Sequence, residues 1–108
     1  MNSILKAKEV FCLKELIEYK ENGINIVELA STKDMVFKLL AFDEGAYLSE
    51  HTAPGNAVVF GLEGRGVINY EGTDYEISAG QNFRFEKDGL HSVKAKGRFK
   101  MALLLVME

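Results

Sequence analysis

Residues 45–64 read GAYLSEHTAPGNAVVFGLEG and carry the clearest structural signal in the chain. They place His51 between two glycine-marked turns and continue into an apolar run whose bulky residues favour a β-strand. The second histidine, His91, follows the turn signal Asp88-Gly89 and also stands at the start of a strand-like segment. Two histidines, each at the mouth of a strand, therefore form the candidate site.

Length and composition predict one globular domain. The chain has 108 residues, of which 47% are hydrophobic and 27% charged, with a single proline, which is ordinary for a soluble protein. This length buries a substantial core without disulfides or metals. We therefore predict one domain over residues 1–108.

Charge and hydropathy argue against two classes of partner. The net charge is −3 and the basic residues are scattered, which disfavours binding to nucleic acid. The longest apolar run, Met101 to Met107, is too short to span a bilayer, and no signal peptide is recognisable. We therefore expect a cytoplasmic protein with no nucleic acid or membrane partner.

The single cysteine limits redox and metal chemistry. Cys12 has no partner for an internal disulfide and no CxxC spacing for a thiolate zinc site. We expect Cys12 to be a small buried apolar residue.

Short strands separated by glycine turns recur along the chain. We predict strands at residues 24–29, 35–42, 58–62, 67–70, 73–77, 82–86, from residue 91, and at 99–107. Residues 10–17 fit either a short helical turn or a strand. Eight or nine short strands without a long helical period indicate an antiparallel sandwich or barrel.

Three local patterns refine this expectation. Glycines at 63–66 and the pair Lys96-Gly97 predict turns, the latter in a last hairpin. In the strand 35–42, Lys38 marks the outer face, so Phe37 and Leu39 should face inward. The final strand, 99–107, is apolar on both faces and should be buried on both sides.

The pattern of glycines and histidines resembles that of the cupins. The first cupin motif runs from a glycine through a His-x-His pair and a glutamate to another glycine, and Gly45, His51 and Gly64 match its frame. The second motif runs from a glycine to a third histidine, and Gly80 and His91 match those positions. The resemblance implies an all-β fold, a small antiparallel double-stranded β-helix (jelly-roll) barrel. It covers residues 35–107, with residues 1–34 as an N-terminal segment and first strands.

Two positions depart from the metal-binding cupin pattern. Cupins that hold a metal use three histidines and a glutamate, because a divalent ion needs several nitrogen and oxygen donors at about 2.0–2.2 Å. The second histidine slot falls on Ala53 and the glutamate slot on Ala57. The resemblance therefore leaves His51 and His91 as ligands for a possible, weakly held divalent metal such as zinc, nickel, iron or manganese.

The barrel lumen is the alternative site, as a pocket for a small molecule. Small barrels hold one small ligand, and such sites are apolar with a few placed polar groups. We expect the pocket to be lined by Phe37, Leu39, Tyr47, Ser49, Val59, Tyr75, Phe83 and Phe85 together with the histidines. The purely structural alternative is a packed aromatic core in which both histidines are neutral and hydrogen-bonded.

The functional prediction is a small cupin barrel that binds a small molecule, a weakly held divalent metal, or both. The alternatives are a metal-dependent enzyme, such as a dioxygenase or isomerase acting on a small organic acid or sugar, and a structural or regulatory sensor barrel. No nucleophile motif is present, so the sequence leaves open whether a reaction is catalysed. The resemblance also implies a homodimer, and the apolar faces of residues 35–42 and 99–107 agree with one.

Overall fold

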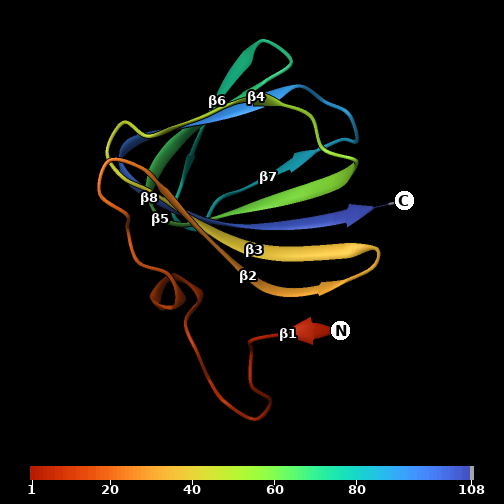
Figure 1. Cartoon of the computed structure of the whole chain (residues 1–108). Helices are drawn as coiled ribbons and strands as arrows, with labels where there is room; N and C mark the ends of the chain where they lie inside the picture. The colour runs from red at the N-terminus through yellow and green to blue at the C-terminus, as the bar shows by residue number, and fades with distance from the viewer. Residues whose placement is uncertain (108) are drawn as a thin grey trace.

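A computed structural model describes residues 1–107, and Glu108, the last residue of the predicted domain, lies outside the described residues. The described chain is a single antiparallel sheet that folds over on itself (Figure 1). Its elements are β1 Asn2–Ser3, the 3₁₀ helix η1 Leu13–Leu16, β2 Ile24–Thr32, β3 Met35–Phe42, β4 Tyr47–His51, β5 Gly55–Tyr70, β6 Thr73–Ser78, β7 Asn82–Phe85 and β8 His91–Met107.

The two long strands, β5 and β8, run through both halves of the folded sheet. Residues 55–64 of β5 pair with residues 99–107 of β8, whereas residues 65–70 pair with residues 91–96. The first pairing belongs to the half that also contains β1, β2, β3 and β7, which we call sheet I. The second belongs to the half that contains β4 and β6, which we call sheet II. The two sheets face each other as the layers of a jelly roll.

Glycines allow β5 and β8 to bend between the sheets. The pairing register shifts on both sides of residues 63–64, and Gly64 and Gly97 have φ angles of +71° and +74°. The turns predicted at 63–66 and at Lys96-Gly97 are therefore wrong, because both segments are β-bulges inside continuous strands. A bulge and a turn need the same positive φ, so the glycine signal does not separate them.

The main core fills the space between the two sheets. Its buried members, each at most 3% exposed, are Leu40, Phe42, Ala57, Val59, Ile68, Ile77, Phe85, Val93, Ala95, Phe99 and Met101. They come from β3, β5, β6, β7 and β8, so the core ties distant parts of the chain together. The prediction of an all-β, small antiparallel double-stranded β-helix (jelly-roll) barrel is confirmed.

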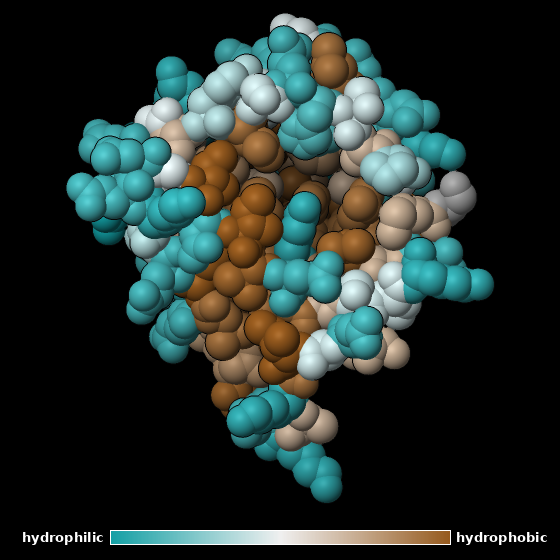
Figure 2. All heavy atoms as spheres, in the orientation of Figure 1, coloured by the Kyte–Doolittle hydropathy of each residue, from teal (hydrophilic) through white to brown (hydrophobic). Residues whose placement is uncertain are grey.

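A second apolar cluster lies on the outside of sheet I. Buried Ile17 of the N-terminal segment and Leu39 of β3 belong to it, and Leu5, Leu13 and Phe37 pack against it. Beside this cluster is an apolar groove of about 420 Å³, to which Phe37 also contributes. Figure 2 shows apolar side chains gathered over the region of β2 and β3. The N-terminal segment thus explains why β3 is apolar on both faces.

The N-terminal segment also settles two local questions. Residues 10–17 contain the short helix η1, and they contact the sheet through Leu13 and Ile17. Cys12 lies just before η1 and is exposed, so the prediction of a buried cysteine is wrong. Within residues 1–107 there is no helix of the length and apolar character needed to cross a membrane.

Candidate functional site

A small cavity lies between the sheets where β4 ends and β8 begins. Its volume is about 120 Å³. His51 is the last residue of β4 and His91 the first of β8, and their Cα atoms are direct partners in the antiparallel pairing. His51 is exposed at the surface, while His91 is only 5% exposed. The lining residues are Ile26, Lys38, Leu40, Leu48, His51, Phe85, His91, Val93, Met101 and Leu103.

Backbone carbonyls fix the tautomer of both histidines. Nδ1 of His51 lies 2.7 Å from the carbonyl oxygen of Ser49, and Nδ1 of His91 lies 2.8 Å from that of Gly89. A carbonyl oxygen only accepts, so each Nδ1 carries the proton and donates it. With the proton on Nδ1, the neutral form of either ring has its lone pair on Nε2.

The two rings lie against each other in the cavity. Their centroids are 4.3 Å apart and the rings meet edge to face at 62°. No fully buried side-chain nitrogen or oxygen among residues 1–107 lacks a hydrogen-bond partner. Nε2 of His91 makes no hydrogen bond with these residues, and His91 lines the cavity, so we infer that this atom is accessible from the cavity. The site thus offers two imidazole groups that accept a hydrogen bond or bind a cation.

The aromatic wall of the cavity keeps His91 neutral. The ring of Phe85 stacks on His91 with centroids 4.0 Å apart and planes 16° from parallel. Burial lowers the pKa of His91 below its usual value of 6.5, and the neighbouring His51 lowers it further, while the Gly89 carbonyl opposes the shift. At neutral pH His91 therefore presents an uncharged imidazole to the cavity.

Lys38 lines the same cavity, so its predicted place on the outer face is wrong. β3 is covered on both faces, and alternation alone does not tell which face is the lumen. Glu28 is the cross-strand partner of Lys38 in the register, but its carboxylate accepts a hydrogen bond from Ser31, at 3.4 Å. Among residues 1–107 no carboxylate forms a salt bridge with Lys38. Lys38 therefore lines the cavity without a salt-bridge partner among residues 1–107.

Four of the predicted pocket residues face the space between the sheets. Phe85 lines the cavity beside both histidines. Val59 is fully buried in the main core, and Phe83 packs against that core. Tyr75 lies at the rim, 43% exposed, with its ring centroid 4.9 Å from that of Phe83. Val59, Phe83 and Tyr75 thus serve as packing around the cavity and do not line it.

The other four predicted pocket residues lie outside the lumen. Phe37 and Leu39 belong to the outer cluster beneath the N-terminal segment, because Lys38 takes the inward position on β3. Tyr47 and Ser49 are exposed, since the register of β4 shifts between residues 48 and 51. That irregularity turns Leu48 and His51 toward the cavity, against simple alternation. No sequence signal marks this shift.

The residues present do not fit a tightly held metal ion. Residues 1–107 contain no group of three or more histidine, cysteine, aspartate or glutamate side chains positioned to share a metal. Ala57, in the slot of the family's glutamate, is 2% exposed in the main core and pairs with Phe85. Lys38 adds a positive charge to the cavity that holds the two imidazoles. Two imidazoles in a cavity that a lysine also lines make a poor cation site, because like charges repel.

The fold and the cavity together place this protein in one class of proteins. This class is the small jelly-roll barrels that have histidines in the space between their two sheets. Residues 38–107 match the family model described as Cupin domain. Since this match spans more than half of the chain, the protein belongs to the cupin family, as the motif frames predicted. No sequence among the curated proteins matches the chain.

Several solved structures share the fold along most of the chain. A cupin superfamily protein from Desulfitobacterium hafniense is 25% identical, with a TM-score of 0.91, over 96% of this chain and 95% of its own. A cupin 2 conserved barrel domain protein from Leptotrichia buccalis is 33% identical, with a TM-score of 0.86, over 89% of this chain and 47% of its own. A conserved Streptococcus pyogenes protein of unknown function has a TM-score of 0.91 at 23% identity, covering 100% of this chain and 96% of its own, which shows the shared fold.

Proposed function

We propose that the protein binds a small organic anion, a carboxylate, in the cavity between its two sheets. The observation that carries this proposal is Lys38, which has no salt-bridge partner among residues 1–107 and lines an otherwise apolar cavity together with His51 and His91. A lysine without a counter-charge attracts an anion, and it binds a carboxylate through a charge-assisted hydrogen bond. A bound carboxylate supplies that charge.

The size and polarity of the cavity narrow the ligand further. An apolar cavity of about 150 Å³ holds benzene, so the 120 Å³ found here suits an anion of about four to six non-hydrogen atoms. Neutral His91 accepts a hydrogen bond at Nε2, so a hydroxyl or amine next to the carboxylate improves the match. Leu40, Val93 and Leu103 cover the remaining apolar part of such a ligand.

Calorimetric titration with acetate, glycolate and lactate tests the proposal. Replacing Lys38 by methionine keeps most of the side-chain volume and removes the charge, so binding should weaken about tenfold or more. Lys33→Met is the matched control, because Lys33 lies in the exposed turn between β2 and β3. Lactamide, the neutral counterpart of lactate, should bind weakly to the parent protein. Equal binding of lactate by parent and Lys38→Met would refute the proposal.

A weakly held divalent cation is the second candidate, favoured by the two Nε2 lone pairs of His51 and His91. Imidazole suits zinc, nickel and iron, whereas manganese prefers oxygen donors. A zinc titration followed by the histidine ring signals in NMR tests it. In the Lys38→Met protein cation binding should strengthen while anion binding weakens, so one variant separates the two candidates. The metal-dependent enzyme alternative depends on this second candidate.

A further inference from the structure

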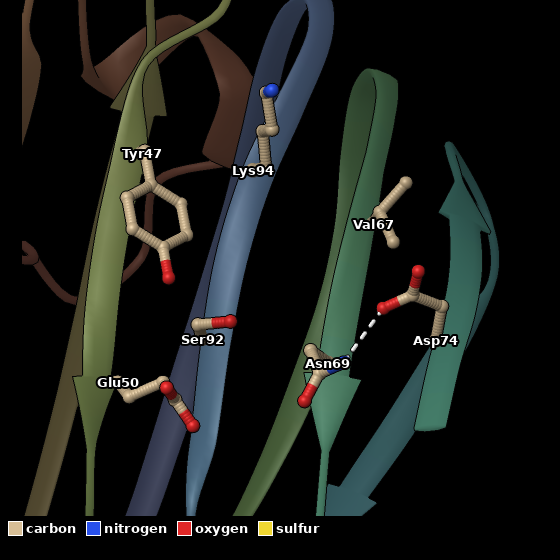
Figure 3. A pocket seen from close by; sticks show the side chains of 7 residues that line it. All are labelled: Tyr47, Glu50, Val67, Asn69, Asp74, Ser92 and Lys94. Atoms are coloured by element: carbon tan, nitrogen blue, oxygen red, sulfur yellow. Dashed lines mark hydrogen bonds between the residues drawn. The ribbon is translucent and has the colours of Figure 1, made fainter. Parts of the chain in front are cut away.

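A second concave surface lies on the outer face of sheet II, away from the lumen. It is a groove of about 520 Å³. Its lining residues are Tyr47, Glu50, Val67, Asn69, Asp74, Ser92 and Lys94 (Figure 3). The residues next to them in sequence, such as Ile68 and Val93, point the other way into the main core. The groove and the cavity are therefore separated by the thickness of one sheet.

Strand pairing sets the groove residues in two rows across β4, β8, β5 and β6. In one row Lys94 pairs with Tyr47 on one side and with Val67 on the other. In the next row Asn69 pairs with Ser92 and with Asp74. Figure 3 shows Tyr47 and Glu50 on the β4 side and Asp74 on the β6 side, with the other four residues between them.

The groove combines an exposed aromatic ring with several uncommitted polar groups. Tyr47 is 54% exposed, whereas Ser92 on the floor is 5% exposed. Asn69 Nδ2 donates to Asp74 Oδ1 at 2.8 Å, which fixes that side of the groove. The side chains of Tyr47, Glu50 and Lys94 form no hydrogen bond or salt bridge with any other part of residues 1–107.

These groups favour a ligand that needs both donors and acceptors. Lys94 and Ser92 donate, the carboxylates of Glu50 and Asp74 accept, and the ring of Tyr47 offers a flat apolar face. Two carboxylates against one ammonium group disfavour an anion, and no group of three ligands favours a metal. A sugar ring has an apolar C–H face and hydroxyls that each donate and accept.

We propose that this groove binds a neutral saccharide, with Tyr47 stacking on a sugar ring and Asp74, Glu50 and Lys94 bonding its hydroxyls. This site is distinct from the anion cavity, because its ligand is uncharged and its residues lie on the opposite face of sheet II. One site can therefore be lost without the other.

NMR titration of the ¹⁵N-labelled protein with glucose, galactose, maltose and cellobiose, each up to about 50 mM, tests the proposal. At least one sugar should shift the backbone amides of groove residues and leave unchanged those of the cavity residues Leu40 and Leu103, which lie in sheet I. Tyr47→Ala should weaken that binding about tenfold, and Tyr47→Phe, which keeps the ring, should retain most of it. Phe11→Ala, which removes another exposed aromatic ring in the N-terminal segment, should change nothing.

Asp74→Ala provides a second variant on the opposite side of the groove. It removes an acceptor for sugar hydroxyls and should also weaken binding about tenfold. The dispersion of the amide spectrum shows directly whether each variant remains folded. The proposal is overturned if none of the four sugars shifts a groove amide, if the shifts lie at Leu40 and Leu103 of the cavity, or if folded Tyr47→Ala binds as the parent does.

Discussion

Replacing Phe85 by leucine should both destabilise the protein and raise the pKa of His91. Phe85 is 2% exposed and stacks on two rings, those of His91 at 4.0 Å and Tyr70 at 5.5 Å between centroids. Phenylalanine to alanine in a core costs about 3–5 kcal/mol, and leucine refills part of the space, so we expect about 1–3 kcal/mol. For a domain of this size each kcal/mol lowers Tm by about 4–8 °C.

The shift of the His91 pKa follows from the same change. Burial is the main cause that lowers this pKa, and Phe85 covers one face of the ring. Leucine covers less of that face and admits water, which stabilises the charged imidazolium. The pKa of His91 should therefore rise toward its usual value of 6.5, as measured from the ring proton signals in a pH titration by NMR.

Phe42→Leu is the matched control for this experiment. Phe42 is 0% exposed in the same core, with its ring centroid 5.8 Å from that of Phe99, and it does not line the cavity. This variant should lose similar stability in denaturant unfolding but leave the His91 pKa unchanged. Equal pKa shifts in both variants, or no shift in Phe85→Leu, would refute the assignment of Phe85 as the cover of His91.

Further measurements test the titration, the metal content, the bends and the assembly. Folding lowers the pKa of His91, so the unfolded chain binds a proton at this histidine more tightly than the folded chain does. The contribution of His91 to the free energy of unfolding is therefore fully present above pH 6.5 and declines as the pH falls below that value. His91→Gln should flatten that decline in urea midpoints between about pH 5 and pH 7, and an unchanged slope would count against the burial argument. Protein purified without a tag or chelator should retain far less than stoichiometric metal after dialysis, because two imidazoles in a cavity that a lysine also lines hold a cation weakly. Elemental analysis measures this metal content. Stoichiometric metal in the parent protein that is lost in a His51→Ala, His91→Ala double variant would contradict the prediction. Gly72→Ala should lower the free energy of unfolding by about 1–2 kcal/mol, because Gly72 has φ +86° and open space around an added Cβ. Gly64→Ala should lower it considerably more, because an added Cβ there meets the carbonyl oxygen of Arg98. Equal unfolding midpoints of the two variants would show that the bulge does not constrain β5. The homodimer stays a prediction, supported by the apolar groove beside the N-terminal segment, and light scattering should give about twice the chain mass of 12.1 kDa, whereas a monomer would exclude it.

Local chemistry along the chain was enough to predict the all-β class and most of the strands. Alternation, β-branched and aromatic residues and glycine turns act over a few residues, so they are visible without the fold. The motif frames also paired His51 with His91 and showed alanines at two ligand positions. These predictions needed only residue identity and spacing.

Only the tertiary structure decided which residues face the cavity. β3 is apolar on both faces because the N-terminal segment covers one of them, so alternation defines two sets of residues without saying which is inside. Lys38 therefore enters the cavity and Phe37 leaves it. The irregularity before His51 reverses the alternation of β4 and turns Tyr47 to the outer groove. Register and the packing of distant segments arise from contacts across the chain, which the local pattern does not encode.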